Sequence, residues 1–162
     1  MGQCGMKKQF RGKFDAKLDD RGRLKVPSKY LSLLDCNYGR EVYVTSLNGD
    51  VVFIYPVKEW EVIEQKLENI RLNSTVQEYI SRTSYWGCET EIDARGRVLV
   101  PPDLRQSAGL SEEIFVLGVR DHLEVWNEGS YRNQYLKGKW SLQKQDEVSR
   151  VLDGIAPLSG NE

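Results

Sequence analysis

Two short motifs, with the same residue types at the same spacing, are the part of this sequence best suited to chemistry. Asp19 and Arg23 lie four positions apart across a glycine turn, and Asp93 and Arg97 repeat the arrangement. A carboxylate at this spacing can orient a guanidinium by a bidentate ion pair or accept hydrogen bonds from the turn amides. A fixed guanidinium suits phosphate oxygens or the O6 and N7 edge of guanine. The motifs therefore indicate contact with nucleic acid.

The motifs belong to two copies of a longer repeat. Residues 18–27 match residues 92–101 at an offset of 74, with Asp, Arg, Gly, Arg and Pro at the same places. Residues 41–44 match residues 113–116 at an offset of 72. Each copy is too small to hold a core alone, and two copies are too few for a solenoid. We therefore expect the two copies to pack on each other.

The residues around the first motif predict a basic hairpin. Apolar and charged residues alternate from Lys13 to Asp19, as in a half-buried strand, and the alternation resumes from Arg23 to Val26. Gly22 lies between these strands, where it can adopt a positive φ at low steric cost. The first motif is therefore expected at the tip of a hairpin, with its cations facing solvent.

The rest of each repeat predicts a short helix and a second hairpin. Pro27 suits the first turn of a helix, and Asn48-Gly49 is a strong hairpin signal. In the second repeat, His122 is expected at an exposed bend. The predicted strands cover residues 13–19, 23–26, 41–45, 51–55, 88–93, 97–100, 114–119 and 123–126. The predicted helices cover residues 28–34, 57–69, 74–84 and 101–109, followed by a weakly amphipathic stretch over 130–151.

These elements predict an α+β fold that is mainly β with helices. The expected organisation is a first repeat over residues 10–56, a helical connector over 57–86, a second repeat over 87–130, and a helical and frayed tail over 131–162.

The predicted DNA-binding side chains are cations on or beside the two turns. Residues 1–29 carry nine Lys or Arg against three acids, although the chain as a whole has a net charge of −1. This end is therefore suited to an anionic partner. The candidates for DNA contact are Arg21, Arg23, Lys25, Arg95, Arg97, Lys13 and Lys17. The residues expected to orient the motifs are Asp19, Asp93, Gly22 and Gly96.

A second interpretation is that the Asp and Arg side chains only stabilise their hairpins. An exposed ion pair contributes ~0.2–1 kcal/mol. The recurrence of the motif favours DNA contact over this interpretation. We also expect Arg23 to matter more than Arg97, because more basic residues surround it in the sequence.

Other classes of function receive no support from the residues. We find no convincing nucleophile–base pair, metal cluster or phosphate-binding loop, so we expect no enzyme, cofactor, metal site or small-molecule ligand. The three cysteines, Cys4, Cys36 and Cys88, are widely spaced and are expected to be unpaired thiols. No apolar run approaches the roughly 18 residues of a membrane helix. Residues 1–9 lack the apolar core of a secretory signal, so a cytoplasmic, nucleoid-associated protein is expected.

The chain resembles the MraZ family of bacterial transcriptional regulators, which carry two domains of the AbrB or SpoVT type. Three features carry the resemblance: the doubled Asp-x-x-Gly-Arg hairpin followed by Val-Pro, the run from Val52 to Trp60, and the strand from Leu123 to Trp126. The resemblance spans about Phe10 to Tyr131.

The resemblance implies a swapped-hairpin β-barrel with pseudo-two-fold symmetry, made by the two repeats and flanked by helices. It also implies a ring-shaped homo-oligomer that binds double-stranded DNA at direct repeats in promoters. The promoters would be those of the division and cell-wall gene cluster, including that of the protein's own gene. The family's Asp-x-x-x-Arg motif maps onto Asp19 and Arg23 and onto Asp93 and Arg97. The alternative from another class is an antitoxin-like or scaffold module that binds a protein.

Overall fold

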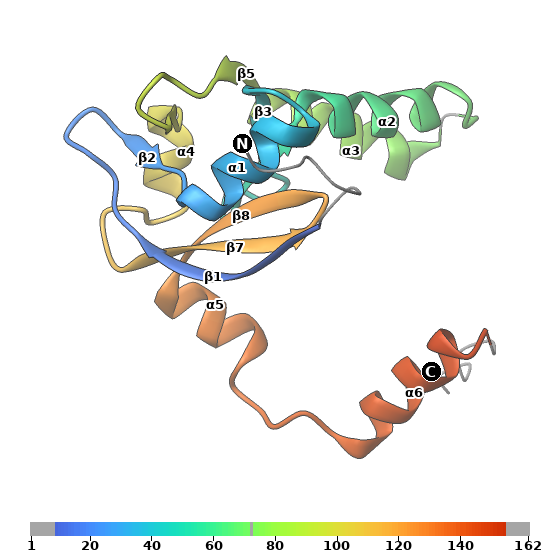
Figure 1. Ribbon diagram of the computed structural model, residues 1–162. Helices are drawn as coiled ribbons and strands as arrows, with labels where there is room; N and C mark the ends of the chain where they lie inside the picture. Colours follow the sequence, from blue (N-terminus) through green and yellow to red (C-terminus); the bar gives the residue numbers. More distant parts are fainter. Residues whose placement is uncertain (1–8, 72, 155–162) are drawn as a thin grey trace. The chain divides into compact units, whose positions relative to one another are not determined.

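The computed structural model describes residues 9–71 and 73–154 (Figure 1). The chain divides into two units, one up to Ser130 and one from Tyr131 onward. The strands are β1 (Phe10–Ala16), β2 (Arg23–Lys25), β3 (Glu41–Thr45), β4 (Val52–Pro56), β5 (Cys88–Glu91), β6 (Arg97–Leu99), β7 (Ile114–Arg120) and β8 (His122–Asn127). The helices are α1 (Ser28–Asn37), α2 (Val57–Glu68), α3 (Ser74–Tyr85), α4 (Pro102–Ser107), α5 (Glu128–Tyr135) and α6 (Leu142–Leu152).

The strands form two antiparallel sheets that mix the two repeats. The larger sheet has the order β1-β7-β8-β4-β3-β5, and the smaller sheet contains β2 and β6. Only the β3–β4 and β7–β8 pairs stay within one repeat; each of the other pairs joins one repeat to the other. The α+β class is therefore confirmed, and the strands are exchanged between the repeats.

A pseudo-two-fold axis relates the repeats. Leu24 pairs with Val98, its own counterpart at the offset of 74, at the centre of the β2–β6 pair. Phe14 lies opposite Val116 in β1–β7, and the equivalent Cys88 lies opposite Val44 in β5–β3. The register is therefore the same on both sides of the axis, which passes through the small sheet.

The first strand of the predicted first hairpin does not pair mainly with the second strand of that hairpin, as expected. Only an isolated bridge between Leu18 and Leu24 joins its two arms. β1 instead pairs along its whole length with β7, from Phe10 opposite Arg120 to Ala16 opposite Ile114. Alternation fixes which face of a strand is buried, but it does not fix which strand lies beside it.

The core is built from both repeats. Leu24, Val26, Val98 and Val100 are fully buried, so the small sheet buries one whole face. On α1, the hydroxyl of the buried Tyr30 lies 2.8 Å from the carbonyl oxygen of Arg11 and 2.6 Å from that of Gly12, so its hydrogen bond to this pair of carbonyls ties the helix to β1.

The helices agree with the sequence pattern in the middle of the chain and differ at some ends. α1 runs three residues further than predicted, and Gly39 then adopts a φ of 85°. The N-cap of α3 is Asn73, whose side chain accepts a hydrogen bond from the Val76 amide at 2.9 Å. The predicted helical tail is two separate helices, α5 and α6. Residues 155–162 of the expected frayed end lie outside the described residues.

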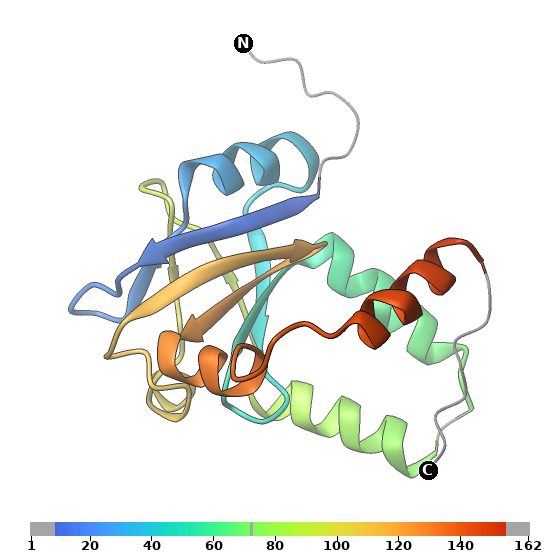
Figure 2. The same ribbon diagram turned by 90° about the horizontal axis from the view of Figure 1, so that it is seen from below.

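α2 and α3 lie at the opposite end of the first unit from β2 in both views (Figures 1 and 2). Within residues 9–71 and 73–154, no helix combines the length and the apolar character needed to cross a membrane.

The expectation of unpaired thiols is wrong for Cys36, which is disulfide-bonded, and correct for Cys88.

The expectation of an exposed histidine at the β7–β8 bend is also wrong. The His122 side chain is only 12% exposed, with Nδ1 2.9 Å from Asp121 Oδ1 and Nε2 3.0 Å from Glu124 Oε2. Its ring stacks on Tyr55 of β4, with 4.5 Å between centroids. Burial alone would lower the pKa of His122, but hydrogen bonds to Glu124 and then Asp121 outweigh it, so the pKa is raised above 6.5.

This arrangement predicts a pH-dependent stability. A histidine with a raised folded-state pKa contributes stability that is fully present below 6.5 and is lost as the pH rises through the folded-state pKa. We expect the free energy of unfolding in urea to fall as the pH is raised above 6.5, and the His122→Gln variant to lose that dependence. A variant that keeps the same pH profile would place its origin elsewhere.

Candidate nucleic-acid interface

The two motifs meet on a short two-stranded ribbon formed by β2 and β6. Arg23 lies opposite Leu99, and Lys25 lies opposite Arg97. Because side chains alternate along a strand, these four residues share the outer face, while the residues between them fill the core. The major groove of DNA is wide enough to admit a two-stranded ribbon.

Each aspartate fixes the turn that precedes its ribbon strand. Asp19 Oδ1 accepts hydrogen bonds from the amides of Arg21 (3.0 Å) and Arg23 (2.9 Å). Asp93 Oδ1 accepts from the amides of Arg95 and Arg97, both at 2.9 Å. The glycines in the two turns, Gly22 and Gly96, both have a φ of 77°. The orienting residues predicted from the sequence therefore hold both turns in one conformation.

The same aspartates join the two repeats through a four-charge cluster. Asp19 Oδ2 lies 2.9 Å from Arg23 Nε and 3.3 Å from Arg97 Nη1. Asp93 Oδ2 lies 3.3 Å from Arg97 Nε and 3.8 Å from Arg23 Nη1. Each carboxylate thus contacts the arginine of its own repeat and that of the other, and we call these four residues the Asp–Arg cluster.

The cluster is only partly open to solvent. The Arg23 and Arg97 side chains are 26% and 22% exposed. Hydrogen bonds from the Arg23 backbone and then the Arg21 backbone hold the pKa of Asp19 below its usual value, although burial opposes them. The Arg97 and Arg95 backbone amides lower the pKa of Asp93 in the same way. Both carboxylates therefore stay charged at neutral pH. Their ion pairs hold the two arginine side chains close to the ribbon, so that they do not extend into solvent.

On the ribbon and its two turns, three cations face solvent without an ion pair to a described residue. Arg21, Arg95 and Lys25 are exposed and have no ion pair among the described residues. Lys25 lies beside Arg97, because β2 pairs with β6, so this cation flanks Arg97 in the fold. The greater importance of Arg23 stays a prediction.

The two other predicted lysines lie off the ribbon. Lys13 is on β1 in the large sheet, where its Nζ lies 3.4 Å from Glu128 Oε2. Lys17 is exposed in the segment between β1 and the first turn. The structure thus brings together five of the seven predicted cations and all four orienting residues.

One cation beside the ribbon was not among the predicted residues. The Arg105 guanidinium of α4 packs directly on Gly22, so that a Cβ at Gly22 would clash with it. A comparison of the repeats could have singled this residue out, because Arg105 aligns with Leu31 at the offset of 74.

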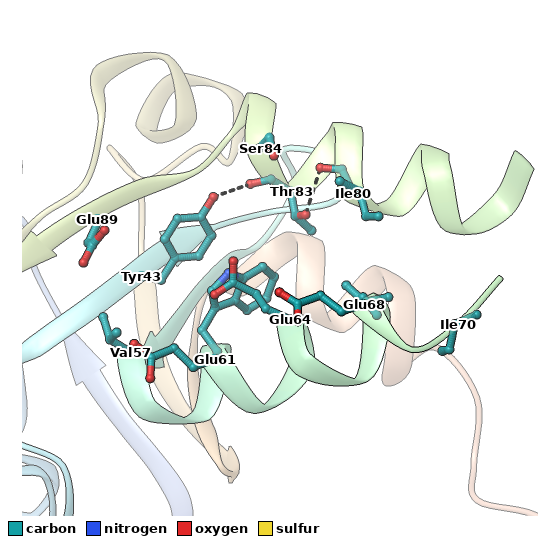
Figure 3. Close-up of a pocket in the computed structure, with 12 residues that line it drawn as sticks. Tyr43, Val57, Glu61, Glu64, Glu68, Ile70, Ile80, Thr83, Ser84 and Glu89 are labelled. Carbon is teal, nitrogen blue, oxygen red and sulfur yellow. Dashed lines mark hydrogen bonds between the residues drawn. The ribbon is translucent and has the colours of Figure 1, made fainter. Parts of the chain in front are cut away.

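A groove at the other end of the unit has a different character. It lies between α2, α3 and β3 and has a volume of about 610 Å³. Its lining combines apolar side chains with four glutamates, Glu61, Glu64, Glu68 and Glu89 (Figure 3). No Lys or Arg is among the described residues that line it, so the groove would repel phosphate and is better suited to a protein. The described residues contain no group of three or more side chains able to hold a metal ion.

Comparison with known proteins agrees with the motifs. The family model described as "MraZ protein, putative antitoxin-like" matches residues 9–82 and 88–151. The chain belongs to the MraZ family.

Relatives in this family are similar over most of their length. The transcriptional regulator MraZ of Acidobacterium capsulatum is 40% identical over 124 residues, which cover 76% of this chain and 85% of the relative. That of Koribacter versatilis is 34% identical over 142 residues (86% and 97%), and that of Escherichia coli O127:H6 is 35% identical over 127 residues (77% and 84%). All three relatives carry the name of a transcriptional regulator.

The packing of Arg105 on Gly22 gives a prediction for the first turn. Gly22→Ala would place a side chain at a φ of 77° and displace the guanidinium, so it should cost more than the ~1–2 kcal/mol of the backbone strain alone. Gly39→Ala is the matched control, because Gly39 has a φ of 85° with no atom close to its Cβ position. Urea unfolding measures both, and equal losses would contradict the packing argument.

Proposed function

We propose that this protein is a sequence-specific DNA-binding transcriptional regulator that binds promoter DNA through the β2–β6 ribbon. The observation that carries the proposal is the Asp–Arg cluster, which joins two identical motifs into one outward face. Four arginines and Lys25 lie on this face or its turns. The names of the relatives support a role in transcription.

The geometry suggests a division of roles among these cations. Arg21 and Arg95 are exposed at the tips of rigid turns and make no ion pair with any described residue, so they are suited to reach phosphates or base edges. Arg23 and Arg97 use both Nε and Nη1 for the cluster, which leaves only part of each guanidinium to face outward. In this arrangement Arg23 and Arg97 set the position of the turns and add positive potential to the ribbon.

The proposed targets are direct repeats in the promoter of the division and cell-wall gene cluster, which includes the protein's own gene. A ring-shaped homo-oligomer with head-to-tail contacts presents its ribbons in the same sense, whereas a two-fold dimer requires a palindrome. Several weak contacts in one ring would raise the overall affinity by multivalency. The protein would act in the cytoplasm at the nucleoid, without a catalytic step.

A protein-binding module is the second candidate, and the acidic groove between α2 and α3 favours it. Its apolar side chains and glutamates suit a basic amphipathic segment of a partner. The family description "putative antitoxin-like" agrees with such a role. The two candidates use opposite ends of the unit, so substitutions at one end can be tested independently of the other.

Two double variants test the main proposal against DNA from upstream of the protein's own gene. Arg21→Ala with Arg95→Ala should weaken binding at least tenfold and lower the slope of log affinity against log salt by ~1.8, without changing the unfolding midpoint. Arg23→Ala with Arg97→Ala should abolish specific binding. It should also lower the urea midpoint of unfolding, because both aspartates lose their partners. Fluorescence anisotropy and urea unfolding provide these readouts.

Lys66→Ala on α2 is the control, because it removes an exposed cation far from the ribbon. Unchanged DNA affinity in both double variants would remove the ribbon from the interface. If wild-type protein bound no DNA but formed a stoichiometric complex with a second protein, and Glu61→Lys with Glu64→Lys disrupted that complex, the second candidate would hold instead.

A further inference from the structure

Arg105 occupies a position that the first repeat fills with an apolar residue. Its side chain, from α4, packs on Gly22 of the first turn, which directly precedes β2. The carbonyl of Gly22 accepts a hydrogen bond from the Val100 amide at 3.2 Å, so this contact lies at the end of the ribbon where β2 begins and β6 ends. At the second turn, Leu31 of α1 packs on Gly96 in the equivalent place.

The guanidinium of Arg105 has no anionic partner among the residues that the structure describes. Its Nε is buried without a hydrogen-bond partner in the part of the chain that the structure describes. No ion pair or side-chain hydrogen bond of Arg105 occurs within that part either, and its terminal nitrogens are not among the buried unpaired atoms. A guanidinium is always charged and usually pairs where it is partly buried, so an unpaired one held against a binding turn is suited to an external anion.

The exchange of strands explains why a cation is needed at this place. Leu99 stands where the first repeat has Lys25, and the antiparallel pairing puts Leu99 opposite Arg23 and Lys25 opposite Arg97. Without Arg105, the first end of the ribbon would have two arginines and the second end would have two arginines and a lysine. With Arg105, each end has three cations: Arg21, Arg23 and Arg105 at one, and Arg95, Arg97 and Lys25 at the other.

The surroundings of Arg105 leave room for a phosphate group. A concave surface of about 600 Å³ lies beside it, with Lys17, Gln106 and Ser111 in its lining. Two carboxylates also line it, and both already have partners. Asp19 belongs to the Asp–Arg cluster, and Glu112 accepts a hydrogen bond from Asn127 Nδ2 at 2.9 Å.

We propose that Arg105 is a DNA-binding residue that contacts a backbone phosphate at the first end of the ribbon. It would supply the positive charge that Lys25 provides at the other end and that Leu99, at the equivalent position, does not. A phosphate is the fitting ligand because Arg105 comes from a flanking helix, and the edges of a ribbon in the major groove meet the DNA backbone. This inference rests on the proposed function, because it requires the ribbon to bind DNA.

The test is a salt titration of DNA binding by full-length variants. Arg105→Leu introduces the residue of the first repeat, and Arg105→Gln keeps a planar polar group but removes the charge. Each should lower the slope of log affinity against log salt by ~0.9, for promoter DNA and for unrelated DNA alike, because a phosphate contact carries no base information. Lys66→Leu, remote on α2, should leave the slope unchanged.

A second-site change separates charge from packing. Adding Leu99→Lys to Arg105→Leu should restore the salt slope to the wild-type value, because it returns a third cation to that end without restoring the contact with Gly22. Circular dichroism checks that each variant is folded. If Arg105→Leu is unfolded, the same comparison with Leu99→Lys is made in the Arg105→Gln variant. Wild-type slopes in the charge-removed variants would overturn the inference while leaving the proposed function intact. A loss that Leu99→Lys does not restore would also overturn it, by assigning Arg105 a packing role. Absence of DNA binding by wild-type protein would instead overturn the proposed function.

Discussion

The Asp–Arg cluster is the interaction on which the rest of the interface depends. β2 and β6 are only three residues long, so backbone hydrogen bonds alone give the ribbon few connections. Asp19 and Asp93 add cross-repeat ion pairs and also accept the amides of both turns. Because one carboxylate serves both purposes, the shape of each turn and the pairing of the two repeats are fixed together. The positions of Arg21 and Arg95 follow from that.

The proposed binding surface is a property of the folded pair and not of either repeat. Exchange of strands places Lys25 of the first repeat beside Arg97 of the second, and α4 of the second repeat against the turn of the first. The repeats can therefore differ in sequence and still balance each other across the pseudo-two-fold axis. The acidic groove lies at the far end of the unit, where its negative charge does not weaken the attraction of the ribbon for an anion.

Local patterns in the sequence predicted most elements and the paired motifs, because turns, caps and alternation act over a few residues. The sequence showed Asp19 and Arg23 as neighbours, yet it could not show that Arg97 reaches the same carboxylate, since strand pairing is a long-range choice between similar faces. His122 was misplaced for a related reason: its burial comes from Tyr55, a residue on a different hairpin. Arg105 was missed because its helix position carries no binding signal until the repeats are superposed.

Hydrogen–deuterium exchange of the free protein and of its complex with promoter DNA tests the central claim most directly, because it reports on the ribbon and on the groove in one experiment. The account predicts that DNA slows exchange over residues 19–25 and 93–99 and leaves α2 and α3 unchanged. Slower exchange confined to α2 and α3, with the ribbon unaffected, would contradict it.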